Sequence, residues 1–287
     1  MKNKKKIVMV LSVFIIILSA IAAMIGIFSN QIKEYADVTT SFGETIQLYN
    51  KGLYARDSIS TASQAIAQDV VTLVVAIPLL IISLYLVKKK SKKGLFLLTG
   101  TVGYFLYTYT SYAFLVVFNA LYLVYVVLMI LSFYSFILCL MELNQFEIRE
   151  MVSDSFPRKT LSVFFFAVGI MLMGMWLGRI LPALMNGSAP VGLEHYSTLG
   201  IQTLDLGWVV PASIVTAYLL RKENKWGYLL AIVFVIKMIT MTAAVSAMIV
   251  FMQINGVAVS VMEKILFPVL LLISIYFMAI MWRKLKA

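Results

Sequence analysis

The sequence is poor in the residues that enzymes and metal proteins most often use at their active sites. The 287 residues include one histidine, His195, and one cysteine, Cys139. One histidine excludes the paired axial ligands of a multi-haem cytochrome and a histidine-based zinc site, and one cysteine excludes a disulfide within the chain. We therefore expect no metal, no other cofactor and no catalytic residue.

Sequence motifs of several large enzyme classes are also missing. The chain has no GxxxxGK[ST] phosphate-binding loop, no HExxH zinc motif and no GxSxG nucleophile turn. The loops expected in the cytoplasm are too short to hold a catalytic domain. An intramembrane lipid-modifying enzyme would need an acidic cluster or a nucleophile with a base, and only Gln68, Asp69 and Tyr104 come near to that. An enzyme is thus the less favoured interpretation.

Charged residues make up only 13% of the chain, whereas 62% is hydrophobic and the mean hydropathy is +0.95. Soluble domains are about half apolar, and a helix that crosses a bilayer needs roughly 20 apolar residues. The sequence predicts an all-α integral membrane protein with about eight transmembrane helices. They fall at about 7–29, 66–87, 94–116, 118–141, 161–182, 203–220, 226–251 and 261–282.

The positive residues predict the orientation of these helices, because lysine and arginine are retained on the cytoplasmic side. If the N-terminus is cytoplasmic, only five of the 24 basic residues fall outside: Lys33, Lys51, Arg56, Arg179 and Lys264. Both termini are therefore expected in the cytoplasm. The net charge of +11 follows from this topology, so a nucleic-acid partner is not expected. The lysine-rich and isoleucine-rich usage is compatible with a bacterial origin and a plasma-membrane location.

An internal similarity predicts how the helices are grouped. The segment from Pro78 to Gly94 aligns without a gap on the segment from Pro211 to Gly227, with identical Pro, Ile, Tyr, Leu, Lys, Lys and Gly residues. Shared LSVF motifs at 11–14 and 161–164 agree with this alignment. We expect two tandem four-helix halves of one orientation, residues 1–150 and 151–287. The first half carries a long outer loop at about 30–65.

The matched prolines fall inside the second and sixth predicted helices. Because proline removes a backbone donor and clashes with the carbonyl four residues earlier, Pro78 and Pro211 are expected to bend these helices. Interrupted helices at equivalent positions of two halves are typical of transporters with a site near the midplane. The alternative is that neighbouring helices satisfy the freed carbonyls and the prolines have no functional role.

Two charged residues are predicted deep in the membrane. Lys237 follows the inner boundary residue Lys225 by 12 residues, or about 18 Å, and Asp205 precedes Arg221 by 16 residues, or about 24 Å. Since unpaired charge in hydrocarbon is costly, we expect Lys237 to pair with Asp205, with Arg179 as a second candidate partner for Asp205. Such a pair can be a functional site or a structural clasp between helices.

Hydroxyl groups line one face of the third predicted helix. They recur at helical spacing, and the equivalent position of the seventh helix is polar; the residues are Tyr104, Tyr107, Thr108, Ser111 and Thr240. Gln68, Asp69 and Asn119 are expected near the outer end of this surface, where Asp69 is more simply explained as a solvated residue at a helix start. The tyrosines near Tyr109, Tyr112 and Tyr122 are equally well explained as an interfacial aromatic belt.

These features favour a multi-pass transporter or permease for a small polar or ionic solute. In this hypothesis the two halves enclose a polar path, Lys237 and Asp205 bind the solute, and an outer vestibule contains Gln68, Asp69, Asn119 and Arg179. The alternative is a non-transporting membrane component: a sensor, an assembly factor or the membrane subunit of a complex with a membrane protein partner. The expected partners are then the lipid bilayer, the solute and, in the alternative, that protein.

Overall fold

The computed structural model describes residues 2–286 and is mostly helical. Within these residues, seven helical spans are long and apolar enough to cross a membrane. The spans are α1 (Lys2–Phe28), α2 (Ile59–Val71) with α3 (Ile77–Lys88), α5 (Tyr122–Leu143), α7 (Arg158–Asn186), α8 (Gly200–Leu204) with α9 (Val210–Arg221), α10 (Lys225–Ile254) and α11 (Val261–Lys284). The chain is an all-α, multi-pass membrane protein.

The remaining long helix, α4 (Lys92–Leu115), occupies the segment predicted as the third span. It has 24 residues, but its tyrosine, threonine, serine and glycine content makes it too polar to count among the seven. Most of its side chains are buried, because α3, α5 and α10 pack around it. The most polar long helix is thus enclosed by the apolar ones, where its hydroxyls, except that of Tyr109, find partners inside the protein.

Two spans are interrupted by a π-helical turn. The turns are Thr72–Ala76, between α2 and α3, and Asp205–Val209, between α8 and α9. Pro78 and Pro211 each lie directly after the turn, as the second residue of the next α-helix. Proline cannot donate the backbone bond that a continuous α-helix needs, and π turns are frequent at functional sites.

The segments that follow these two prolines share three local features, and each feature recurs after 133 residues. Lys90 and Glu223 have positive φ angles of 62° and 52°, and Ser91 and Asn224 cap the next helix through their side chains. At Gly94 and Gly227, an added Cβ would lie 2.5 Å from an atom of Leu86 and of Leu219, respectively. The glycines therefore permit the same close approach of consecutive helices.

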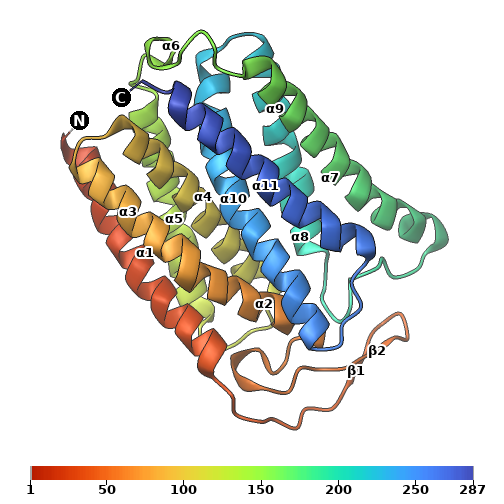
Figure 1. Ribbon diagram of the computed structural model, residues 1–287. Coiled ribbons are helices and arrows are strands. Elements are labelled where there is room, and N and C mark those ends of the chain that lie inside the picture. Colours follow the sequence, from red (N-terminus) through yellow and green to blue (C-terminus); the bar gives the residue numbers. More distant parts are fainter. Residues whose placement is uncertain (1, 287) are drawn as a thin grey trace.

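The helices form one bundle in which α10 joins two groups. In the first group α5 packs on α1 and α4, and α3 packs on α4; in the second α7 packs on α9, and α9 and α11 pack on α10. Helix α10 also contacts α2 and α4. Both termini and α6 (Ile148–Met151) lie at one end of the bundle, and the strands lie at the other (Figure 1).

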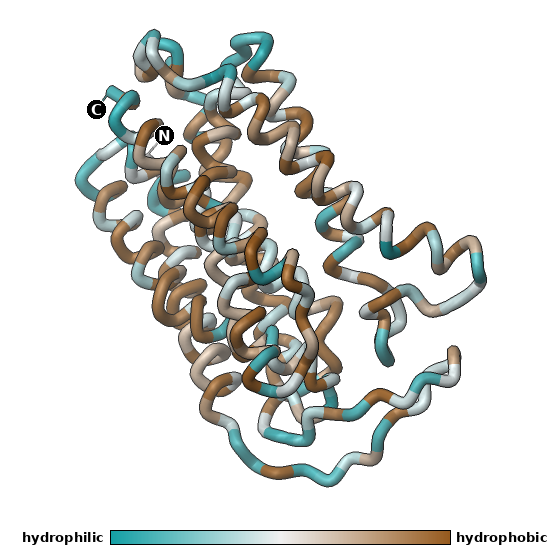
Figure 2. The backbone as a smooth tube through the Cα atoms, turned by 45° about the vertical axis from the view of Figure 1, so that its right-hand side comes forward, coloured by the Kyte–Doolittle hydropathy of each residue, from teal (hydrophilic) through white to brown (hydrophobic). Residues whose placement is uncertain are grey.

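The end of the bundle opposite the termini carries the long loop of the first group. It contains the two-stranded antiparallel sheet β1 (Val38–Thr39) and β2 (Thr45–Ile46) and a short 3₁₀ turn, Gly52–Tyr54. The predicted loop end at 65 is wrong: α2 already begins at Ile59, because Ser58 caps it by accepting a bond from the Thr61 N–H at 3.0 Å. Hydrophilic segments gather at the ends of the bundle (Figure 2).

Candidate functional site

A cavity of about 540 Å³ lies between the two groups of helices. Residues of α2, α4 and α10 form one wall, residues of α7, α8 and α11 form the other, and the loop 187–199 covers the end that lies opposite the termini. Much of the lining is apolar, including six methionines: Met171, Met175, Met238, Met241, Met248 and Met252. Five charged side chains also line the cavity: Arg179, Glu194, Asp205, Lys237 and Glu263. This combination of apolar surface and few polar groups is typical of small-molecule sites.

Asp205 is the first residue of the π turn Asp205–Val209 and is held by two aromatic donors. The Tyr107 hydroxyl of α4 donates to Oδ1 at 2.7 Å, and the Trp176 indole N–H of α7 donates to Oδ2 at 2.9 Å. The carboxylate therefore joins α4, from the first group of helices, to two elements of the second group. Each oxygen has one donor that fixes its position.

Lys237 lies beside this network but does not pair directly with Asp205, so the predicted ion pair is wrong. Its ammonium nitrogen lies 4.2 Å from the centroid of the Tyr107 ring, a cation–π contact. Its stem passes Gly103 of α4, where an added Cβ would lie 3.8 Å from the lysine Cγ. Tyr107 thus stands between the two charges, with its hydroxyl toward Asp205 and its ring toward Lys237.

Arg179 pairs with Glu263 of α11, so its predicted partnership with Asp205 is also wrong. The distance between the arginine Nη2 and the glutamate Oε1 is 2.6 Å, and the guanidinium lies 5.3 Å from the centroid of the Trp176 ring. Glu263 also accepts bonds from Ser260 in the capping box at the start of α11. The pair therefore links α7 to α11 at the edge of the cavity.

The structure brings some of the polar residues predicted for the site to the cavity wall and excludes others. Besides the charged residues, Gln68, Tyr107, Thr108 and Ser111 line the cavity. Four predicted residues lie outside the lining: Tyr104, Thr240, Asp69 and Asn119. Tyr104 and Thr240 are buried, and Thr240 donates to the Lys237 carbonyl of its own helix at 2.9 Å. Asn119 accepts from the Leu121 N–H at 2.9 Å in the turn before α5.

Gln68 connects the cavity to the buried hydroxyls behind it. Its side-chain amide donates to the Tyr104 hydroxyl at 2.7 Å and to Thr108 Oγ1 at 2.8 Å. Thr72, at the start of the first π turn, completes this group with a 2.9 Å hydrogen bond to Tyr104. Tyr104 therefore helps to fix Gln68 rather than reaching the cavity itself.

Asp69 is buried, so its interpretation as a solvated helix start is wrong. Only 1% of its surface is exposed, because α2 begins ten residues earlier, at Ile59. The Tyr54 hydroxyl donates to Oδ2 at 2.6 Å and the Tyr112 hydroxyl to Oδ1 at 3.1 Å. Gly26 of α1 leaves room for this carboxylate, since an added Cβ would lie 1.9 Å from Oδ2.

The loop that covers the cavity is tied to the residues that precede α2. The Tyr196 hydroxyl donates to Asp57 Oδ1 at 3.0 Å, and the Ser58 hydroxyl donates to Glu194. Asp57 also accepts a bond from the Val117 N–H at 2.9 Å. Burial, with a smaller contribution from the charge of Glu194, raises the pKa of Asp57 to about 7 against the effect of these two hydrogen bonds. We call these contacts the outer clasp, after the side of the membrane on which the positive residues predict them.

Sequence reasoning missed Trp176 and the outer clasp. Trp176 lies three residues before Arg179, and residues at this spacing share a face of a helix, so the pair could have been found together. Two contacts of the outer clasp join residues more than 130 positions apart, and its members follow no periodic pattern. No sequence signal indicated it.

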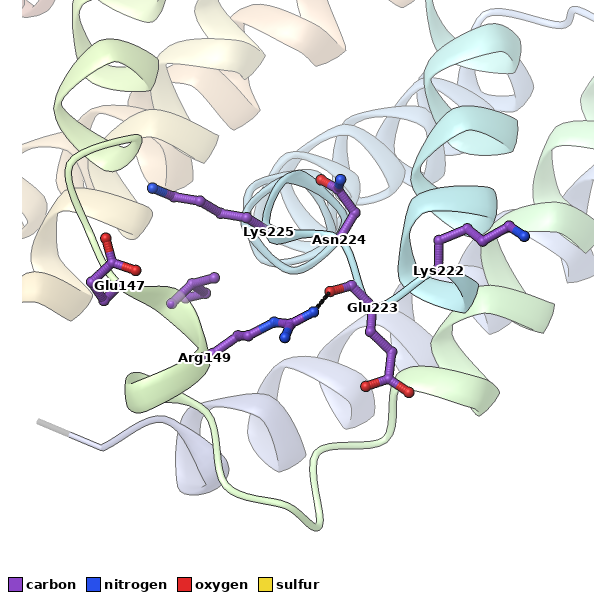
Figure 3. A pocket seen from close by; sticks show the side chains of 7 residues that line it. Glu147, Arg149, Lys222, Glu223, Asn224 and Lys225 are labelled. Atoms are coloured by element: carbon purple, nitrogen blue, oxygen red, sulfur yellow. Dashed lines mark hydrogen bonds between the residues drawn. The ribbon is translucent and has the colours of Figure 1, made fainter.

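A second cavity of about 320 Å³ lies at the end of the bundle that carries the termini. Three basic and two acidic side chains line it, and Figure 3 shows the Arg149 guanidinium bonded to a backbone carbonyl. Arg149 donates to the Glu223 carbonyl at 2.7 Å and Lys225 to the Asn144 carbonyl at 2.5 Å. These contacts fasten α6 and its flanking segments to the turn between α9 and α10.

No model of a known protein family matches the chain, and no curated protein or solved structure is significantly similar to it. The function must therefore be argued from the site. Within residues 2–286, no cluster of three or more His, Cys, Asp or Glu side chains is arranged to hold a metal ion.

Proposed function

We propose that the protein is a transporter for a small polar or ionic solute, and that the solute binds in the 540 Å³ cavity. The observation that carries this proposal is the placement of Asp205 and Lys237 on the wall of an apolar cavity between helices long enough to span a membrane. Charged groups at such positions are costly and are typical of solute pathways. Asp205, Lys237, Tyr107, Thr108 and Ser111 would contact the solute.

The proposed topology has eight crossings, with α4 as the crossing enclosed by the others, and both termini in the cytoplasm. We propose a plasma-membrane location in a bacterium and two four-helix halves, α1–α5 and α7–α11. The matching π turns, caps and glycines 133 residues apart support the two halves. The basic residues near α6 and the termini support the orientation.

The proposed mechanism uses the unequal contacts between these halves. Helix α2 packs along α10, whereas its counterpart in the second half, α8, meets α4 over a short length only. The cavity lies on the side of the bundle where α4 and α8 meet, and the two halves have fewer contacts there than where α2 packs on α10. Transport would require the halves to move so that this side closes and the cavity opens toward the other face. The π turns next to Pro78 and Pro211 interrupt two of the spans. The backbone of these spans would bend at the turns when the halves move.

Access to the cavity from both faces of the membrane tests the proposal. In a Cys139→Ala background, Met241→Cys places one thiol on the cavity wall, one turn from Lys237. The protein is reconstituted in oriented proteoliposomes, and a membrane-impermeant methanethiosulfonate reagent is added outside or trapped inside. A transporter should be labelled from both faces, because the cavity opens alternately to each.

The control thiol is Leu272→Cys on α11, whose side chain is 66% exposed on the surface of the bundle and should remain unlabelled in the bilayer. Labelling of Met241→Cys from one face only would contradict transport and favour the alternative of a sensor or membrane subunit. Absence of labelling from both faces would contradict a solvent-accessible cavity altogether.

A further inference from the structure

We propose that the solute carries one anionic group, a carboxylate or a phosphate, attached to an apolar body, and that Lys237 binds the anionic group. This inference rests on the solute site proposed above and names the class of its ligand. It depends on which charged groups at the cavity already have partners within the protein and which does not.

The carboxylates on the cavity wall are already engaged. Asp205 accepts bonds from Tyr107 and Trp176, and Glu263 is paired with Arg179 at 2.6 Å. Glu194 accepts the Ser58 hydroxyl in the outer clasp. A cationic solute would have to compete with these donors or share the carboxylates with them.

Lys237 differs from the other charged groups of the cavity. Within residues 2–286 its ammonium group makes no ion pair and no hydrogen bond; the face of the Tyr107 ring lies 4.2 Å away, and the charge of Asp205 acts on it from beyond ion-pair distance. An ammonium group has three donors and no acceptor capacity, and a ring face occupies only one side of it. The free donors therefore suit an anionic oxygen, which would stand opposite the Tyr107 ring.

The remainder of the cavity indicates the body of the solute. A volume of about 540 Å³ is far larger than an inorganic anion needs and falls in the range for organic ligands. Met238 and Met241 flank Lys237 on α10, and Met171 and Met175 line the opposite wall on α7. Methionine side chains adapt to apolar ligands of different shapes. The expected ligand therefore has an anionic head near Lys237 and a flexible apolar remainder among the methionines.

Three probes of one size and different charge test the inference: 4-phenylbutyrate, 4-phenylbutan-1-ol and 4-phenylbutylamine. Their dissociation constants are measured at pH 7.4 by equilibrium dialysis against the full chain in lipid nanodiscs. The amount of probe that partitions into the lipid of empty nanodiscs is measured separately and subtracted. We expect the carboxylate to bind at least about tenfold more tightly than the alcohol, and the amine least tightly, because a nearby charge is poorly screened in an apolar cavity. Comparison with 4-phenylbutyl phosphate then distinguishes a carboxylate head from a phosphate head.

Variants of the lysine assign the preference to this residue. Lys237→Met should abolish the advantage of the carboxylate over the alcohol, whereas Lys237→Arg should keep it. The exposed Lys264, outside the cavity, supplies the matched control, since Lys264→Met should bind all probes like the wild type. If Lys237→Met does not assemble, Lys237→Gln provides the same comparison.

Three results would overturn the inference: equal or tighter binding of the alcohol or the amine, a preference for the carboxylate that survives Lys237→Met, or no binding of any probe. Tight binding of the alcohol would leave the solute site of the proposed function intact, because only the charge of the ligand would be wrong. Failure of the two-sided labelling test would instead remove transport and leave anion binding to be judged by these dissociation constants.

Discussion

Replacing Gly26 of α1 with alanine should disrupt the buried carboxylate of Asp69. The new Cβ would lie 1.9 Å from Asp69 Oδ2 and 2.9 Å from the Tyr54 hydroxyl. A carbon and an oxygen cannot approach to 1.9 Å, so the carboxylate must rotate or α1 must move away from α2. Either change breaks the 2.6 Å bond from Tyr54 and strains the 3.1 Å bond from Tyr112.

The expected loss of stability can be worked out from these contacts. Overpacking a well-packed core costs about 1–3 kcal/mol, and leaving a buried polar group without its partner costs about 1–3 kcal/mol. The side chain of Asp69 has no room to escape, because it is 1% exposed. We expect Gly26→Ala to lower the free energy of unfolding by roughly 2–6 kcal/mol, the two contributions together.

Unfolding by sodium dodecyl sulfate in mixed micelles, followed by circular dichroism, measures this loss. Gly174→Ala on α7 is the matched control, because nothing lies within 4 Å of an added Cβ there. In the double variant with Asp69→Ala, the cost of Gly26→Ala should fall by at least about 1 kcal/mol, since contacting residues are not additive. A change below about 0.5 kcal/mol for Gly26→Ala would refute the packing described around Asp69.

Three further predictions concern the site and its supports. Tyr107→Phe keeps the ring beside Lys237 but removes a donor from Asp205, and it should lower the free energy of unfolding by about 1–3 kcal/mol in the same assay. Ser260→Ala removes the capping box of α11 and should cost about 0.5–2 kcal/mol. Asp57 has a pKa of about 7 in the folded chain against 3.8 ordinarily, so the folded state holds a proton that the unfolded state releases, and stability falls as the pH rises from 4 to 7. Relative to Asp57→Asn, which keeps the acceptor oxygen, the wild type should lose roughly 3–4 kcal/mol between pH 4 and 8.

Each of these predictions has a result that would contradict it. Tyr107→Phe as stable as the wild type would mean that Asp205 does not depend on the tyrosine hydroxyl. An unchanged stability of Ser260→Ala would show that the start of α11 is held by the Arg179–Glu263 pair alone. If the wild type and Asp57→Asn respond equally to pH, the proton is not held at the outer clasp.

The positions of the helices could be predicted from the sequence because a span has a minimum apolar length. That requirement places α1, α5, α7, α10 and α11 within a few residues. The start of α2 was missed since its first residues, ISTASQAIA, are small and weakly apolar; the cap at Ser58 decides it. This shift of the helix start is why Asp69 was taken for a solvated residue.

The side-chain partners could be predicted only in part. Counting residues along a helix gives the depth of Lys237 and Asp205, but it gives neither the rotation of each helix nor the groups that lie between them. Tyr107, from another helix, lies beside both residues and separates them. In the same way, Arg179 had a nearer carboxylate in Glu263 at the start of α11. Lys237 and Asp205, which the residue count places at similar depths, line one cavity but are not partners.

The free charge of Lys237 in the cavity is the central claim, and the reactivity of a neighbouring thiol tests it most directly. In the Cys139→Ala background, the rates of Met241→Cys with an anionic and a cationic methanethiosulfonate reagent are each divided by the rate with free cysteine. We expect the anionic reagent to be favoured at least about fivefold, because a cation in an enclosed site concentrates anions, and the ratio to fall toward one when Lys237→Met is added. A ratio that favours the cationic reagent, or one that Lys237→Met does not change, would contradict the account.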